Sequence, residues 1–146
     1  MPVIDSPGED WLKRLANKER DRRSKIISFE ALLPAFSHIL GAHLQADADE
    51  YQKEFPGETV IVEYDEKTAQ FSIVCSGYKP PPRATVKINP IKQHIVCSFD
   101  DAGNNPGWEE TLQVSDLGLH LKGCDLNSTA RDLSKKILTT VLFPAL

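Results

Sequence analysis

The spacing of apolar residues divides the chain into two helical ends and a middle section of strands. Apolar side chains recur every three or four residues from Ile26 to Leu44, and again from Leu126 to Leu142. Between Pro56-Gly57 and Lys122 the apolar residues recur every second position instead, which is typical of strands. The pattern therefore predicts a helix, a series of strands and a second helix.

Six strands are expected, at about 58–64, 70–76, 83–89, 92–100, 110–115 and 117–122. Short turns between them predict an antiparallel meander. Within each strand the apolar residues fall on one parity, and this set is Phe71, Ile73, Cys75, Ala84, Val86, Ile88, Ile95, Cys97, Phe99, Leu112, Val114, Leu117, Leu119 and Leu121. Since one apolar face needs a cover, the fold class predicted is α+β, with both helices packed on one face of the sheet.

The chain of 146 residues has the usual length of one domain. We expect a single α+β domain over 1–146, with a charged helical arm (1–25), a main N-terminal helix (26–55), an antiparallel sheet (58–122) and a C-terminal helix (125–143). Ser6 is the expected N-cap of the arm, and Pro34 is expected to kink or interrupt the main helix. Asp125, Asn127 and Ser128 are candidate caps of the last helix.

Composition and cysteine usage favour a soluble protein of the cytoplasm. No run of about 18 apolar residues is evident and the N-terminus does not resemble a leader, so we expect no membrane association. Three cysteines at irregular spacing indicate reduced, buried thiols. Because strand parity directs Cys75 and Cys97 inward and the histidines of the strands outward, no metal site is predicted.

Charge is strongly segregated along a chain whose net charge is only −4. The segment 13–25 carries seven basic residues against Glu19 and Asp21, whereas 45–66 carries eight acidic residues against Lys53. In addition, an apolar turn precedes the main helix and would stay in water without a partner. The arm is therefore a candidate partner contact, through Trp11, Leu12, Leu15, Arg20, Arg22 and Arg23.

A second candidate surface is the polar face of the sheet. Its parity places Lys87, His94, His120 and Lys122 outward, and these four are candidates for contact with a ligand or partner. An ordinary solvated sheet face explains the same pattern.

The function expected from these features is a non-enzymatic protein-interaction or adaptor domain that binds another protein or a second copy of itself. No nucleotide, metal or nucleophile motif is present, and no cofactor is predicted. One alternative is a small-molecule or lipid-binding pocket between sheet and helices, lined by Phe36, Phe71, Phe99 and Leu119. Another is nucleic-acid binding by the basic arm, against which stand the pI of about 5.5 and the lack of stacking aromatics.

Overall fold

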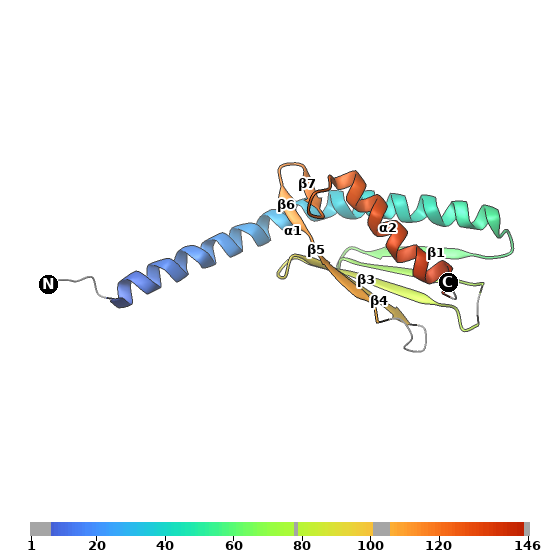
Figure 1. Cartoon of the computed structure of the whole chain (residues 1–146), viewed down its shortest axis with the longest axis horizontal. Helices are drawn as coiled ribbons and strands as arrows, with labels where there is room; N and C mark the ends of the chain where they lie inside the picture. Colours follow the sequence, from blue (N-terminus) through green and yellow to red (C-terminus); the bar gives the residue numbers. More distant parts are fainter. Residues whose placement is uncertain (1–6, 78, 101–105, 145–146) are drawn as a thin grey trace.

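The computed structural model describes residues 7–77, 79–100 and 106–144, with side chains from Asp10 onward. It is an α+β fold built around an antiparallel meander (Figure 1). The elements are α1 (Pro7–Glu54), β1 (Val60–Asp65), β2 (Gln70–Cys75), β3 (Arg83–Asn89), β4 (His94–Asp100), β5 (Trp108–Thr111), β6 (Gln113–Ser115), β7 (Gly118–His120) and α2 (Leu126–Leu142). Strands β1 to β5 form one sheet in chain order, and β6 and β7 form a separate hairpin.

The arm and the main N-terminal helix are one element, which corrects the division expected near residue 25. Helix α1 runs unbroken for 48 residues and includes Pro34. Proline removes one amide donor, but Pro34 and Glu30 are both exposed, so water can satisfy the freed carbonyl. Phe29 and Phe36, on either side of Pro34, are buried in the same core and hold the helix together there. The predicted cap, Ser6, lies outside the described residues.

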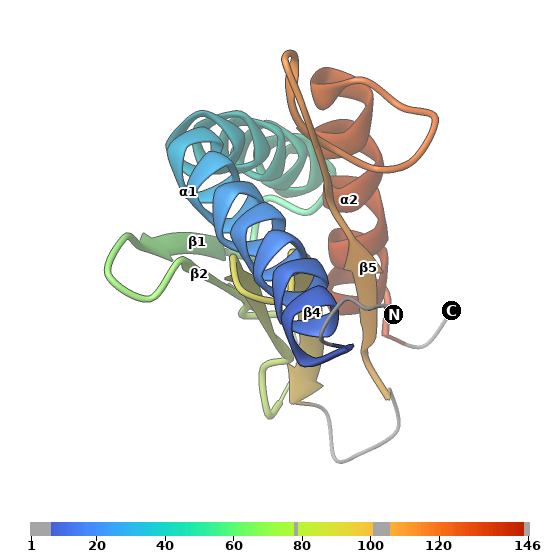
Figure 2. The same cartoon turned by 90° about the vertical axis from the view of Figure 1, so that its left-hand side faces the viewer.

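Both helices cover the same face of the five-stranded sheet, as predicted (Figure 2). The inward parity is confirmed for Ile73, Ala84, Val86 and Ile95, which are fully buried. On the opposite face, register aligns Ser72, Thr85 and Ser98 in one row across β2, β3 and β4. The sheet therefore buries one side and leaves a polar side outward.

Of the last two predicted strands, only the start of the first, at Glu110 and Thr111, belongs to the five-stranded sheet, as part of β5. Leu112 is buried and its N–H donates to Gln93 O at 2.9 Å, which continues the pairing of β4 with β5 by one residue. Beyond that point the chain leaves the sheet, and β6 pairs only with β7. Leu117, predicted to face the core, lies in the turn of this hairpin and is 77% exposed.

Helix α2 begins and ends where its sequence signals predict. The side chain of Asp125 accepts a hydrogen bond from Ser128 N at 2.7 Å, as an N-cap does. The helix ends at Leu142, two residues before Pro144. Ser134 Oγ donates to Asp47 Oδ2 at 2.7 Å, and this bond joins α2 to α1.

One helix of the described residues is long and apolar enough to cross a membrane, by length and composition only. An 18-residue stretch of α1 reaches a mean hydropathy of 1.2, and 22% of it is buried inside the protein. This is weak evidence of a membrane or signal segment, because the core helix of a soluble protein has the same length and composition. Helix α1 also buries Phe29, Phe36 and Leu40 in the core, so the finding does not conflict with a soluble protein.

Candidate functional site

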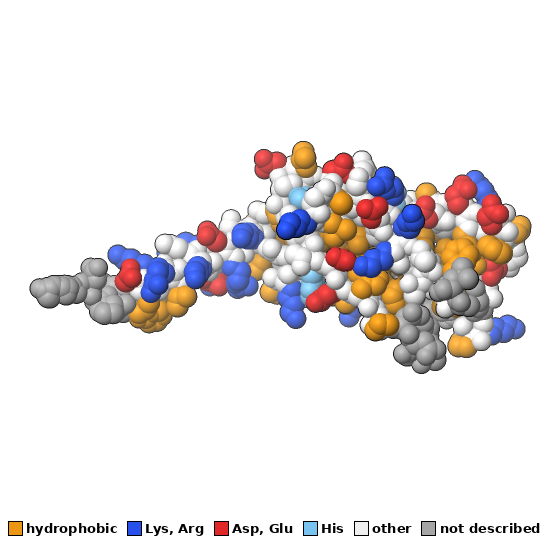
Figure 3. Space-filling view, in the orientation of Figure 1, with side chains coloured by type: hydrophobic (Ala, Val, Ile, Leu, Met, Phe, Trp, Pro, Cys, Tyr) orange, Lys and Arg blue, Asp and Glu red, His pale blue; other side chains and the backbone are white. Residues whose placement is uncertain are grey.

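The N-terminal part of α1 projects away from the rest of the molecule (Figure 1). We call the segment Asp10–Lys25 the arm; none of its side chains is buried, and from Asp10 onward the first buried residue of the helix is Phe29. Trp11, Leu12 and Leu15 are 49%, 57% and 51% exposed. Figure 3 shows hydrophobic side chains gathered on the underside of the arm. The three candidate residues therefore form one apolar surface in water.

This patch continues the core-facing side of α1. Trp11 and Leu15 lie eighteen and fourteen residues before Phe29, which at about 3.6 residues per turn returns them to nearly the same side of the helix. The side that packs on the sheet in the body is thus apolar at the arm tip, where no part of the described chain covers it. Such a patch is typical of a contact surface.

The basic residues of the arm are only partly available for a partner. Glu19 accepts hydrogen bonds from Arg22 and Arg23 at 2.8–2.9 Å, and these bonds lower the pKa of its carboxyl to about 2. Arg20 donates to Asn17 at 2.7 Å. The predicted arginine cluster therefore stabilises the helix itself, although the arm retains seven basic and three acidic side chains, a net charge of +4.

Of the four residues predicted on the open sheet face, only Lys87 and His94 lie there. His94 Nδ1 is 3.2 Å from Glu109 Oε2 on the neighbouring strand β5. Placing His120 and Lys122 on this face was wrong. His120 ends β7 in the separate hairpin, and its ring Nδ1 lies 3.0 Å from Leu121 O. Lys122 follows that strand, so the break at Leu112 carries both residues away from the five-stranded sheet.

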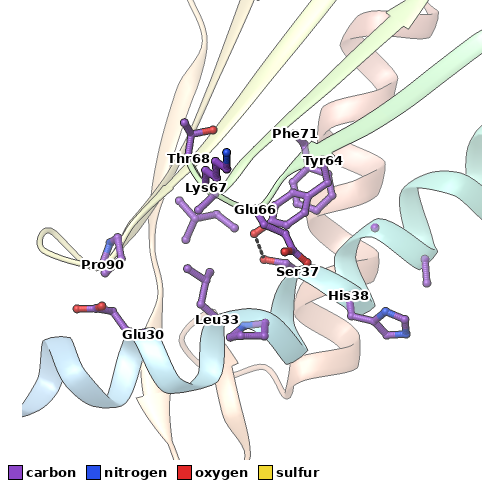
Figure 4. Close-up of a pocket in the computed structure, with 15 residues that line it drawn as sticks. Glu30, Leu33, Ser37, His38, Tyr64, Glu66, Lys67, Thr68, Phe71 and Pro90 are labelled. Atoms are coloured by element: carbon purple, nitrogen blue, oxygen red, sulfur yellow. Dashed lines mark hydrogen bonds between the residues drawn. The ribbon is translucent and has the colours of Figure 1, made fainter.

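A groove that the sequence did not reveal lies between α1 and two turns at one end of the sheet (Figure 4). We call it the turn groove; its volume is about 830 Å³. Its lining includes Leu33, Gly41, Phe71 and Ile88 as apolar residues and Glu30, His38, Glu66, Lys67 and Thr68 as polar ones. Tyr64 OH, in the same groove, donates to Ser37 Oγ at 2.9 Å.

The turns that form this groove are built alike. Asp65 Oδ1 accepts from Lys67 N at 2.9 Å, and Asn89 Oδ1 accepts from Ile91 N at the same distance. Each turn then ends on a residue with positive φ, Ala69 and Gln93. Side chains that bond their own turn fix its shape, so the wall of the groove is preformed. The two turns lie at the same end of the sheet because the strands form a meander. No local sequence motif indicates that they are neighbours.

The turn groove is not the pocket that the sequence predicted between the sheet and the helices. Phe36 and Leu119 are fully buried in the core, and Phe99 is packed against it. Of the four predicted lining residues, Phe71 alone reaches the turn groove.

A second groove lies between the end of α1 and α2, and we call it the helix groove. It has a volume of about 570 Å³ and a floor of Tyr51, Phe55, Leu138, Leu142 and Phe143. Phe55 and Phe143 are 44% and 37% exposed, and both rings lie within 5.6 Å of the Tyr51 ring, centroid to centroid. Burial, followed by the hydrogen bond to Glu58, raises the pKa of the Tyr51 phenol, which stays protonated.

The rim of the helix groove is charged on both sides. Asp47, Glu50 and Glu54 line it from α1, and Arg131 and Lys135 line it from α2. Sequence analysis found the acidic segment but not its pairing with α2, because that depends on how the two helices pack.

The cysteines are free thiols with different access to water. Cys75 and Cys97 are buried and Cys124 is partly exposed. Burial raises the pKa of the Cys97 thiol to about 12, so it remains protonated and unreactive at pH 8. We expect iodoacetamide at pH 8 to label Cys124 in the native protein, and all three cysteines in 6 M guanidinium chloride, as counted by mass spectrometry. If Cys97 were labelled in the native state as completely as Cys124, its burial in β4 would be contradicted.

Within the described ranges, no group of three or more His, Cys, Asp or Glu side chains converges in a way that would hold a metal ion. Comparisons with known protein families, with curated proteins and with solved structures found no significant match. The case for a function therefore depends on the surfaces described above.

Proposed function

We propose that this chain is a non-enzymatic interaction domain that docks on a protein partner through its arm. The observation that carries the proposal is the apolar patch of Trp11, Leu12 and Leu15, presented on a helix that projects beyond the body. Exposed tryptophan and leucine on a rigid helix are typical of helix-in-groove recognition. The basic side chains around the patch favour a partner surface with acidic groups.

The long helix is itself an argument for docking. Isolated helices of fewer than about 15 residues are marginal in water, and no side chain of the arm is buried to stabilise it. Its ion pairs, such as Arg23 with Glu19 at 2.8 Å, contribute little individually because they are exposed. Keeping such an arm helical with its apolar side in water makes sense when a partner buries that side.

The test is site-specific photocrosslinking in the cells that make the protein. Trp11 is replaced by p-benzoylphenylalanine, and the matched control carries it at Ile27, which is 68% exposed and lies about 160° around the helix axis from Trp11. We expect discrete adducts from position 11 and none from position 27. Equal labelling at both positions, or no adduct at position 11, would contradict the proposal.

Free buried thiols favour the cytoplasm as the location, because cysteines persist in reduced form there. Nucleic-acid binding is less well supported as the function of the arm, since four of its basic residues already contact neighbouring side chains. That use predicts retention on heparin at low salt that falls steeply as salt rises.

The turn groove supports a second candidate function, the binding of a small, largely apolar molecule. Its volume of about 830 Å³ lies in the range of ligand sites, and it combines an apolar floor with the Ser37 and Tyr64 hydroxyls. The probe is 8-anilinonaphthalene-1-sulfonate, an anionic dye with an apolar aromatic body. We expect Ala42→Trp, which fills the groove, to abolish saturable binding, and Ala46→Trp, one turn further along, to leave it unchanged. Equal binding by both variants would rule the site out.

A further inference from the structure

Each end of the molecule carries an apolar patch, and the charges around the two patches are of opposite sign. At one end the arm presents Trp11, Leu12 and Leu15 among basic side chains. At the other end the helix groove presents Phe55 and Phe143 beside the acidic last turns of α1. Figure 3 shows this second surface as apolar and acidic side chains close together at the end opposite the arm.

The arm cannot reach the helix groove of its own chain. Both lie on α1, which is a single unbroken helix. From the centre of the apolar patch, near residue 13, to Tyr51 is 38 residues, or about 57 Å at about 1.5 Å per residue. Any contact between these two surfaces is therefore between molecules.

The charges around the two surfaces fit each other. Arg14 and Lys18 follow Trp11 by three and seven residues, so both flank the apolar side of the arm. Glu50 and Glu54 are four apart on the α1 rim of the groove, with the same spacing as Arg14 and Lys18. A helix laid in the groove with its apolar side down would set these basic residues beside the acidic rim.

We propose that the arm of one molecule docks in the helix groove of a second copy, with Trp11 and Leu15 on the aromatic floor and Arg14 and Lys18 beside Glu50 and Glu54. This inference rests on the proposed function, and it names the partner. The contact joins two different surfaces of the chain, so repetition closes into a symmetric dimer or ring, or continues as a head-to-tail assembly.

Charge reversal tests the contact in the full chain. The arm-reversed variant is Arg14→Glu with Lys18→Glu, and the groove-reversed variant is Glu50→Lys with Glu54→Lys. All four positions are exposed, and exchanges of surface residues usually change stability by less than about 0.5 kcal/mol. Both variants should therefore keep the wild-type circular dichroism spectrum and melting temperature.

We expect sedimentation equilibrium to show concentration-dependent self-association of the wild type, weakened roughly tenfold or more in each variant. An equimolar mixture of the two variants should associate again, because each reversed surface then meets a complementary one. The control Asp116→Lys, in the turn of the β6–β7 hairpin, should associate like the wild type.

Three results would overturn the inference: a monomeric wild type up to millimolar concentration, no association in the mixture, or arm-dependent flotation with anionic phosphatidylserine vesicles in place of self-association. Photocrosslinking separates this failure from failure of the proposed function. If position 11 forms an adduct with a different protein while the chain is monomeric, the arm is a docking element and the second copy is not its partner. If position 11 forms no adduct, both proposals fail.

Discussion

Val86→Asp is expected to unfold the protein. Val86 is fully buried in the centre of β3, with Phe71 and Cys97 as its cross-strand neighbours. A carboxylate there would be desolvated and unpaired, at a cost of several kcal/mol out of the roughly 5–15 available to a typical domain. Thermal melts followed by circular dichroism measure the loss. Ile95→Asp, fully buried on β4, should behave in the same way.

Lys87→Asp is the matched control, because Lys87 is the next residue of the same strand and points to the opposite, exposed face. We expect it to cost less than about 1 kcal/mol. His94 is a poorer control, since Glu109 lies 3.2 Å from its ring and would repel a new carboxylate. A loss for Lys87→Asp as large as that for Val86→Asp would mean that the outer face is covered as well.

Gly107→Ala should be among the most damaging single-methyl additions in the described chain. Gly107 has φ of +77°, and a Cβ at this position would lie 2.5 Å from Cys97 O, a backbone atom that cannot move aside on its own. The left-handed conformation alone costs about 1–2 kcal/mol for a residue with a side chain. With the clash added, we expect about 2–4 kcal/mol, read from urea unfolding midpoints at unchanged m.

Two other glycines distinguish the cost of the left-handed conformation from the cost of the clash. Gly123 has φ of +79° but open space around its Cβ position, so Gly123→Ala should cost only the conformational part, about 1–2 kcal/mol. Gly57 has neither a positive φ nor a close neighbour, and Gly57→Ala should change stability by less than about 0.5 kcal/mol. Equal losses at Gly107 and Gly123 would show that strand β5 can shift away from Cys97.

Local signals in the sequence determined the helices and most of the sheet. The Asp125 cap and Pro144 bound α2, and two-residue alternation placed β3 at Arg83–Asn89 and assigned its faces correctly. Such signals succeed because capping and strand parity depend on residues near one another in the chain. The exposed patch at Trp11, Leu12 and Leu15 was also evident, because the polar stretch after it separates it from the core stripe.

Tertiary structure decided what alternation and spacing do not encode. Alternation continues past Leu112, yet the chain leaves the sheet there and β6 pairs only with β7, which removes His120 and Lys122 from the open face. Pro34 stays within α1 because side chains on both sides of it are buried in one core. Both grooves form where elements distant in sequence pack together, and their shape depends on that packing rather than on any local motif.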